Sequence, residues 1–132
     1  MQTPQEQQCL TLSIPAEPCW TLVVRMALGG AGALMGLDID LMDDLRTAAD
    51  ETCDFLMHQP RKVQRIEMAC RLEEGAVCTV LSCVWAQECQ TCEEMDIDVT
   101  RGILETLIPM VELEADGVCI RSVSLTLPLP VK

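Results

Sequence analysis

Residues 40–58 constrain the fold of this chain more than any other stretch. Mostly apolar residues recur in this stretch with the period of a helix, so in a helix they would form one apolar stripe. These residues are Leu41, Leu45, Ala48, Ala49, Thr52 and Leu56. Asp40 is placed to cap this helix, and Pro60 ends it because proline cannot continue the hydrogen-bond ladder. A helix with one apolar stripe is stable when the stripe packs against another layer.

The rest of the chain supplies that second layer. Alternating or continuous apolar runs predict strands at 9–14, 63–72, 77–85, 110–114 and 118–129. Helical periodicity predicts two further helices, at 17–36 and 98–108. We therefore predict an α+β fold: a two-layer sandwich in which three helices cover one face of a mixed, mainly antiparallel sheet.

Length and composition further restrict the fold and the function that this chain can have. We expect the 132 residues to form a single domain, 1–132, with an aliphatic core, since 49% of residues are hydrophobic but only 2% are aromatic. The net charge of −12 argues against nucleic-acid or anionic-membrane binding, because such surfaces repel acidic proteins. The first residues lack the pattern of a signal peptide, and no run approaches the ~20 apolar residues that span a bilayer. We expect a cytoplasmic protein.

The glycine-rich run within 17–36 invites interpretation as a phosphate-binding loop. Gly30 and Gly32 begin a Gly-x-Gly-x-x-Gly pattern, but Met35 stands at the third glycine, and the run follows helical sequence where the motif requires a strand. We predict that these glycines instead allow close packing of a helix.

The run from Ala48 to His58 resembles the corresponding helix of the GHKL-type, or histidine-kinase-like, ATPases, and most closely that of the anti-sigma-factor serine kinases. Glu51 and Cys53 match that pattern. The resemblance implies that Glu51 orients or deprotonates the attacking group and that an asparagine four residues later holds Mg²⁺. Here that position is Phe55, which has no oxygen to offer, and Asp54 is the nearest replacement.

Two further motifs of that family are incomplete. The strand at 77–85 should run into Asp-x-Gly-x-Gly, which reads adenine and closes on the nucleotide, but no glycine lies between Gly75 and Gly102, and Trp85 occupies the expected place. The segment around Arg101 and Gly102 resembles the last nucleotide box, in which a helix N-terminus faces the phosphates. One glycine of that box is present.

The resemblance and these losses together imply an anti-sigma-factor-like regulatory protein with impaired or lost ATP binding, acting on a sigma factor or an anti-anti-sigma protein. The alternative is an active ATP-binding anti-sigma serine/threonine kinase, with Glu51 as base, Asp54 as Mg²⁺ ligand, and Arg101 and Gly102 at the phosphates. Family members are often dimers, and edge strands leave room for a homodimer.

Two other interpretations stay open. The chain could be a small α+β domain without a ligand. Cys89 and Cys92 form a Cys-x-x-Cys in a polar loop, which is typical of zinc or thiol chemistry when a second pair is present, but the sequence supplies only one such pair.

Overall fold

The computed structural model describes residues 9–86 and 97–130 of the chain. The strands are β1 (Cys9–Pro15), β2 (Val63–Glu73), β3 (Ala76–Trp85), β4 (Met110–Asp116) and β5 (Cys119–Pro128). The helices are the short 3-10 turn η1 (Pro18–Trp20), α2 (Thr21–Met35), α3 (Ile39–Met57) and α4 (Asp98–Leu107). The predicted order of strands and helices is confirmed.

The strands form one five-stranded sheet in the order β1-β2-β3-β5-β4. All four ladders are antiparallel, so the sheet contains none of the parallel pairing that our expectation of a mixed sheet allowed. The β2–β3 turn has positive φ at both central residues, Glu74 (50°) and Gly75 (76°), as a tight hairpin turn between twisted strands requires. This hairpin joins the two longest-paired strands of the sheet.

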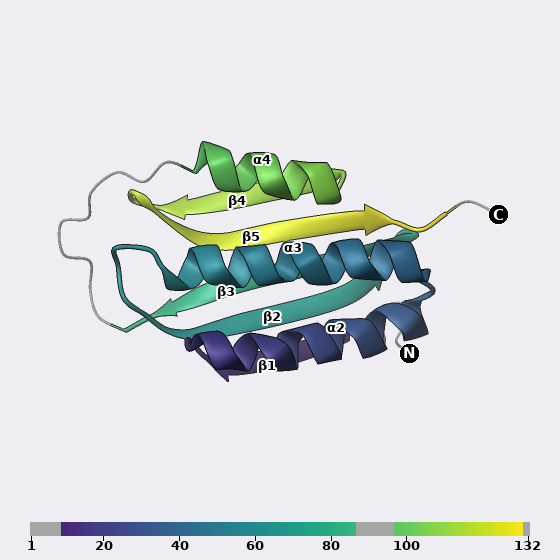
Figure 1. Ribbon diagram of the computed structural model, residues 1–132, viewed down its shortest axis with the longest axis horizontal. Helices are drawn as coiled ribbons and strands as arrows, with labels where there is room; N and C mark the ends of the chain where they lie inside the picture. The colour runs from purple at the N-terminus through teal and green to yellow at the C-terminus, as the bar shows by residue number, and fades with distance from the viewer. Residues whose placement is uncertain (1–8, 87–96, 131–132) are drawn as a thin grey trace.

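The helices lie on one face of the sheet, which completes the predicted two-layer sandwich (Figure 1). The core between the layers is aliphatic, as the composition predicted, and its largest fully buried side chains include Ile14, Leu28, Leu45, Leu56, Ile66, Leu81, Leu104 and Leu125. Gly32 of α2 is buried, and a Cβ there would stand 3.1 Å from Cδ1 of Leu37. Close packing is therefore confirmed at Gly32, whereas Gly30 is exposed with open space around it.

Two helix starts differ from the sequence prediction. The N-cap of α3 is Asp38, whose side chain accepts a hydrogen bond from the backbone N–H of Leu41 at 2.9 Å, so Asp40 lies inside the first turn. For α4, the sequence favours Asp98 as the cap, but the N-cap residue is Ile97 and Asp98 is the first helical residue. Both helices begin earlier than we expected.

The apolar stripe of α4 is only half buried. Leu104 and Ile108 are fully packed, but Val99 is 64% exposed and Ile103 is 40% exposed. The helical period puts all four on one apolar stripe. The helix covers the β4–β5 end of the sheet with its Leu104 side and leaves the Val99 side to solvent.

One helical stretch, Pro18–Met35, is long and apolar enough to cross a membrane when judged by length and composition alone, with a mean hydropathy of 1.3. This differs from our expectation that no such run exists. In the folded chain the same stretch packs against α3 and β2 through Val24, Leu28 and Met35.

Candidate functional site

The predicted catalytic and cofactor-binding residues lie on α3 and α4. The C-terminus of α3, the end of β3, the start of α4 and the β4–β5 turn gather at one end of the molecule, on the left in Figure 1. Glu51 is half-buried in the middle of α3 and makes no ion pair with any other described residue. It is available for contacts with a ligand or a protein.

Asp54 faces solvent on α3, one turn after Glu51. Its side chain is 73% exposed, and its Oδ1 lies 3.2 Å from Nδ1 of His58. The same Nδ1 lies 2.7 Å from the backbone oxygen of Asp54. This local pair holds the carboxylate next to the helix end. Asp54 does not share the side of the helix that points into the core.

Phe55 occupies the position where the related helix would hold Mg²⁺. Its side chain belongs to the hydrophobic core, and the residue is only 9% exposed. Mg²⁺ requires an octahedral shell of oxygen ligands, and a buried phenyl ring offers none. The residues present therefore do not fit a magnesium ion held at this position.

The start of α4 also fits a phosphate poorly. Gly102 lies inside the helix and not ahead of it, as the predicted helix over 98–108 already implied. The backbone N–H of Arg101 is already used, since it donates to the carbonyl of Ile97 at 2.9 Å. Asp98 places a carboxylate in the first turn, where it competes with any anion for the helix dipole. The Arg101 side chain is exposed.

Trp85, at the end of β3, is held from two sides. Its indole Nε1 donates to Oδ2 of Asp116 at 3.0 Å, and the guanidinium of Arg61 lies 4.4 Å from the ring centroid. Arg61 also pairs with Asp116 at 3.2 Å, which closes the triad. A cation over an indole face and a satisfied indole N–H are both stabilising. The ring is therefore fixed at the end of β3.

Gln59 ties the end of α3 to β5. Its Nε2 donates to the carbonyl of Ile120 at 2.7 Å, and its Oε1 accepts from the N–H of Ile120 at 2.6 Å. The residue is 7% exposed. Sequence reasoning missed Gln59, Arg61 and Asp116, because their partners are distant in the sequence and no local pattern links them.

A partly exposed ion pair between α2 and α3 lies near two buried thiols. Asp50 pairs with Arg25 across the two helices at 3.5 Å, and burial raises the pKa of its carboxyl even though Arg25 and Arg46 oppose that shift. Burial, and then the nearby Asp50 carboxylate, raise the pKa of the Cys53 thiol to about 12. The pKa of Cys83 is likewise raised to about 12, chiefly by burial. These two thiols are core fillers in protonated form.

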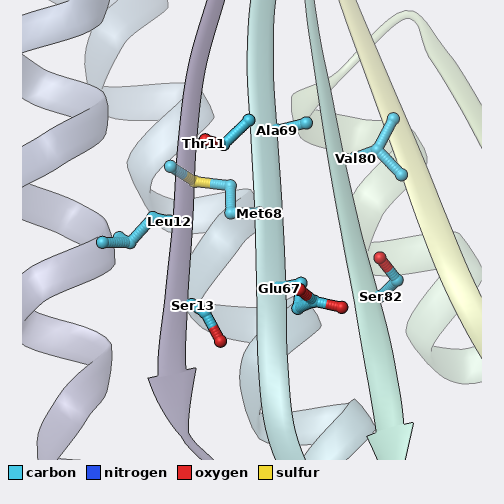
Figure 2. A pocket seen from close by; sticks show the side chains of 8 residues that line it. All are labelled: Thr11, Leu12, Ser13, Glu67, Met68, Ala69, Val80 and Ser82. Carbon is cyan, nitrogen blue, oxygen red and sulfur yellow. The ribbon is translucent and has the colours of Figure 1, made fainter.

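Two hollows open elsewhere on the molecule. One, of about 360 Å³, lies on the face of the sheet that the helices leave uncovered, where Thr11, Ser13, Glu67 and Ser82 surround Ala69 (Figure 2). The other, of about 660 Å³, lies between the edge of β1 and α2. Neither is lined by the predicted residues Glu51, Asp54, Arg101 and Gly102.

No protein-family model matches the sequence, and no curated protein is significantly similar to it in sequence. In structure, the chain is similar to the RsbU and RsbW domains of Rv1364c from Mycobacterium tuberculosis, with a TM-score of 0.70 and 17% sequence identity. The fold is of the histidine-kinase-like type. The similarity covers 92% of this chain and 32% of that chain, so this chain spans about a third of its length. At this identity the similarity concerns the fold.

The predicted architecture is confirmed, and the helix bounds put Glu51 on α3 and Arg101 on α4. These two helices pack against each other. Cys89 and Cys92, which the sequence predicts to lie in a polar loop, are outside the described residues. Within the described residues, no cluster of three or more His, Cys, Asp or Glu side chains could hold a metal ion.

Proposed function

We propose that this protein is an anti-sigma-factor-like regulator that acts through protein–protein contacts and has impaired or lost ATP binding. The burial of Phe55 in the core is the observation on which the proposal rests. The position that should bind a cation instead contributes to packing. Returning it to a metal site would require both a new side chain and the loss of a core group.

Three other features support the same function. Asp54, the replacement ligand, is paired with His58 on the exposed side of α3. Asp98 occupies the first turn of α4, where a phosphate would have to approach. Phosphoryl transfer depends on positioning and on cations that neutralise developing charge, so losing the Mg²⁺ ligand and the anion site together removes most of the catalytic power.

The partner class follows from the fold similarity and from the family resemblance of α3. We propose a sigma factor or an anti-anti-sigma protein as the partner, encountered in the cytoplasm. The net charge of −12 favours partners with basic surfaces, because complementary charge raises the rate of association. Half-buried Glu51, which makes no ion pair with a described residue, offers a carboxylate to such a partner.

Calorimetric titration with Mg-ATP tests the loss of nucleotide binding. We expect no binding tighter than ~100 µM, which corresponds to about −5.5 kcal/mol. The alternative function, an active serine/threonine kinase with Glu51 as base and Asp54 as metal ligand, requires tighter binding. Glu105→Gln, at an exposed acid on α4, is the control variant. The proposal would be overturned if the wild type bound Mg-ATP this tightly and if Asp54→Asn, but not Glu105→Gln, weakened the binding.

Binding to purified partners tests the regulatory role. We expect a sigma factor or an anti-anti-sigma protein to form a complex with the protein equally well with and without ATP. Substitution of Glu51 by lysine should weaken that complex, whereas the matched substitution Glu105→Lys should not. A complex that forms only when ATP is present would contradict the proposal.

A further inference from the structure

A groove of about 660 Å³ lies between α2 and the free edge of β1, and we call it the β1–α2 groove. α2 contacts β1 and lies along it in Figure 1, so the groove follows the strand. Its outer wall is poorly covered, since Met26 is 68% exposed and Leu34 is 88% exposed. The lining includes Cys9 and Leu10 of β1 with Met26, Gly30, Ala31 and Leu34 of α2.

The lining of the β1–α2 groove has no charged side chain, in a chain whose net charge is −12. Arg25 is the single charged residue of α2, and it turns toward α3, where it pairs with Asp50 at 3.5 Å. β1 carries no charged residue. An uncharged apolar groove on an acidic protein indicates a surface that another molecule covers. The group that enters it must also be uncharged, because a charge buried there would have no partner.

The edge of β1 offers unpaired backbone groups beside this groove. The N–H of Ala16 donates to the carbonyl of Gln64 at 3.1 Å, so in this antiparallel ladder alternate residues direct their backbone groups to β2. Thr11 and Cys9 therefore direct theirs outward, as Ser13 does. An Arg65 N–H donates to the Ser13 carbonyl at 3.1 Å, which leaves the half of β1 from Cys9 to Thr11 open. No described strand lies beyond β1.

The opposite edge of the sheet is protected against such pairing. β4 carries Glu112, Glu114 and Asp116, and its ladder with β5 has an irregularity between Glu114 and Ala115. Charges and bulges of this kind prevent edge-to-edge pairing. The β1 edge is therefore the edge of this sheet that suits an added strand.

The dimensions of the β1–α2 groove fit a short extended segment. Between the lining residues Met26 and Met35, α2 rises ~13 Å, at ~1.5 Å per residue. A strand rises ~3.3 Å per residue, so about four residues of extended chain span the groove. Two of these four residues would direct their side chains to the α2 side of the sheet.

We propose that the β1–α2 groove binds an extended, uncharged peptide segment of a partner protein by strand addition. The peptide backbone pairs with the outward groups of Cys9 and Thr11. Cross-strand neighbours share a face of the sheet, so the peptide residues beside Leu10 and Leu12 direct apolar side chains toward α2 and into the groove. Main-chain hydrogen bonds supply affinity in this mode of binding, and the alternate side chains supply specificity. The site does not depend on the proposed loss of ATP binding.

A separate peptide fits the groove better than the other occupants. In a second copy of the chain, Leu10 and Leu12 already pack against that copy's own core, so pairing of β1 with β1 would leave the groove unfilled. A helix uses its backbone groups internally and offers none to the β1 edge. A helix that lies on a membrane carries several Lys or Arg residues beside its apolar side, and α2 has only Arg25.

Fluorescence anisotropy with labelled hexapeptides and the full chain tests the proposal. The probes are a panel in which two apolar residues, chosen from leucine, isoleucine, valine, methionine and phenylalanine, alternate with serine and threonine. We expect the best probe to bind with a Kd below ~100 µM. N-methylation of the probe's backbone at the positions that face β1 keeps the side chains and removes the hydrogen bonds. It should raise the Kd at least about tenfold.

Three variants of the protein locate the binding. Gly30→Leu should raise the Kd at least about tenfold, because the new side chain fills the groove. A Cβ at Gly30 meets nothing within 4 Å, and leucine is a better helix former than glycine, so the fold tolerates this change. Thr11→Pro removes an outward N–H and should weaken binding similarly. Val23→Leu adds bulk at an exposed position of α2 outside the groove lining and should leave the Kd unchanged.

Circular dichroism establishes that each variant folds, and Gly30→Leu keeps the test decisive if Thr11→Pro does not fold. The proposal is overturned if no probe of the panel binds at ~1 mM, or if Gly30→Leu and the N-methylated probe bind as the unmodified pair does. A dimer in sedimentation equilibrium that Thr11→Pro dissociates would assign the edge to a second copy and overturn it. So would flotation with phosphatidylcholine vesicles that Gly30→Leu abolishes. None of these results would alter the outcome of the Mg-ATP titration.

Discussion

Replacing Phe55 with alanine would remove the aromatic ring from the core beneath α3. A phenylalanine buries about 150–250 Å² when it folds into a core, and Phe55 is 9% exposed, so roughly 180 Å² would be lost from the packed interior. At ~25 cal/mol per Å² this corresponds to about 4.5 kcal/mol, which falls within the range of about 3–5 kcal/mol typical of such truncations. That is a large part of the ~5–15 kcal/mol by which a domain is usually stable.

Urea denaturation followed by circular dichroism measures this loss. Phe55→Leu, which keeps an apolar side chain of similar length, should cost only about 1–1.5 kcal/mol. Phe55→Asn restores the amide of the related helix, but it should cost about 1–3 kcal/mol more than alanine because the amide is buried without a partner. We expect Phe55→Asn to gain no Mg-ATP binding. A loss below about 1.5 kcal/mol in Phe55→Ala would refute the assignment of this position to packing.

Three further predictions concern Gln59, Asp50 and the cysteine thiols. Gln59→Ala should lower the free energy of unfolding by about 2–3 kcal/mol in urea titrations, because both backbone groups of Ile120 lose their partner. Burial raises the pKa of the Asp50 carboxyl, so folding disfavours its carboxylate relative to its protonated form. The contribution of this group to the free energy of unfolding therefore decreases as pH rises above 3.8. The stability of Asp50→Asn relative to the wild type should therefore increase from acidic to neutral pH, and a flat difference would contradict this. Iodoacetamide at pH 8 should label exposed Cys9 in the folded protein but label Cys83, whose pKa is about 12, only after unfolding, as mass spectrometry can measure.

Much of the fold could be predicted from the chain because each helix and strand has its own periodicity. The alternation in β5 and the single stripe of α3 each determine which side of an element is apolar, and the two-layer architecture follows because those sides must be covered. The ends of helices were harder to predict. Asp38 and Asp40 are both suitable caps, and only the geometry of the first turn selects Asp38.

The candidate site was predictable only in part. The sequence alone pointed to α3 through the family resemblance at Glu51 and Phe55, because that resemblance is a local feature of one helix. It did not indicate that Arg61, Trp85 and Asp116 meet at the end of the sheet, since they come from different strands and turns.

The sequence by itself therefore determined the order and type of the helices and strands and the aliphatic character of the core. These properties depend on neighbouring residues, through periodicity and side-chain chemistry. Tertiary structure alone decided that the Phe55 ring lies in the core, that the Val99 side of α4 faces solvent, and that the β1 edge and α2 form one uncharged surface. These depend on which elements lie side by side, and that is settled only when the layers pack.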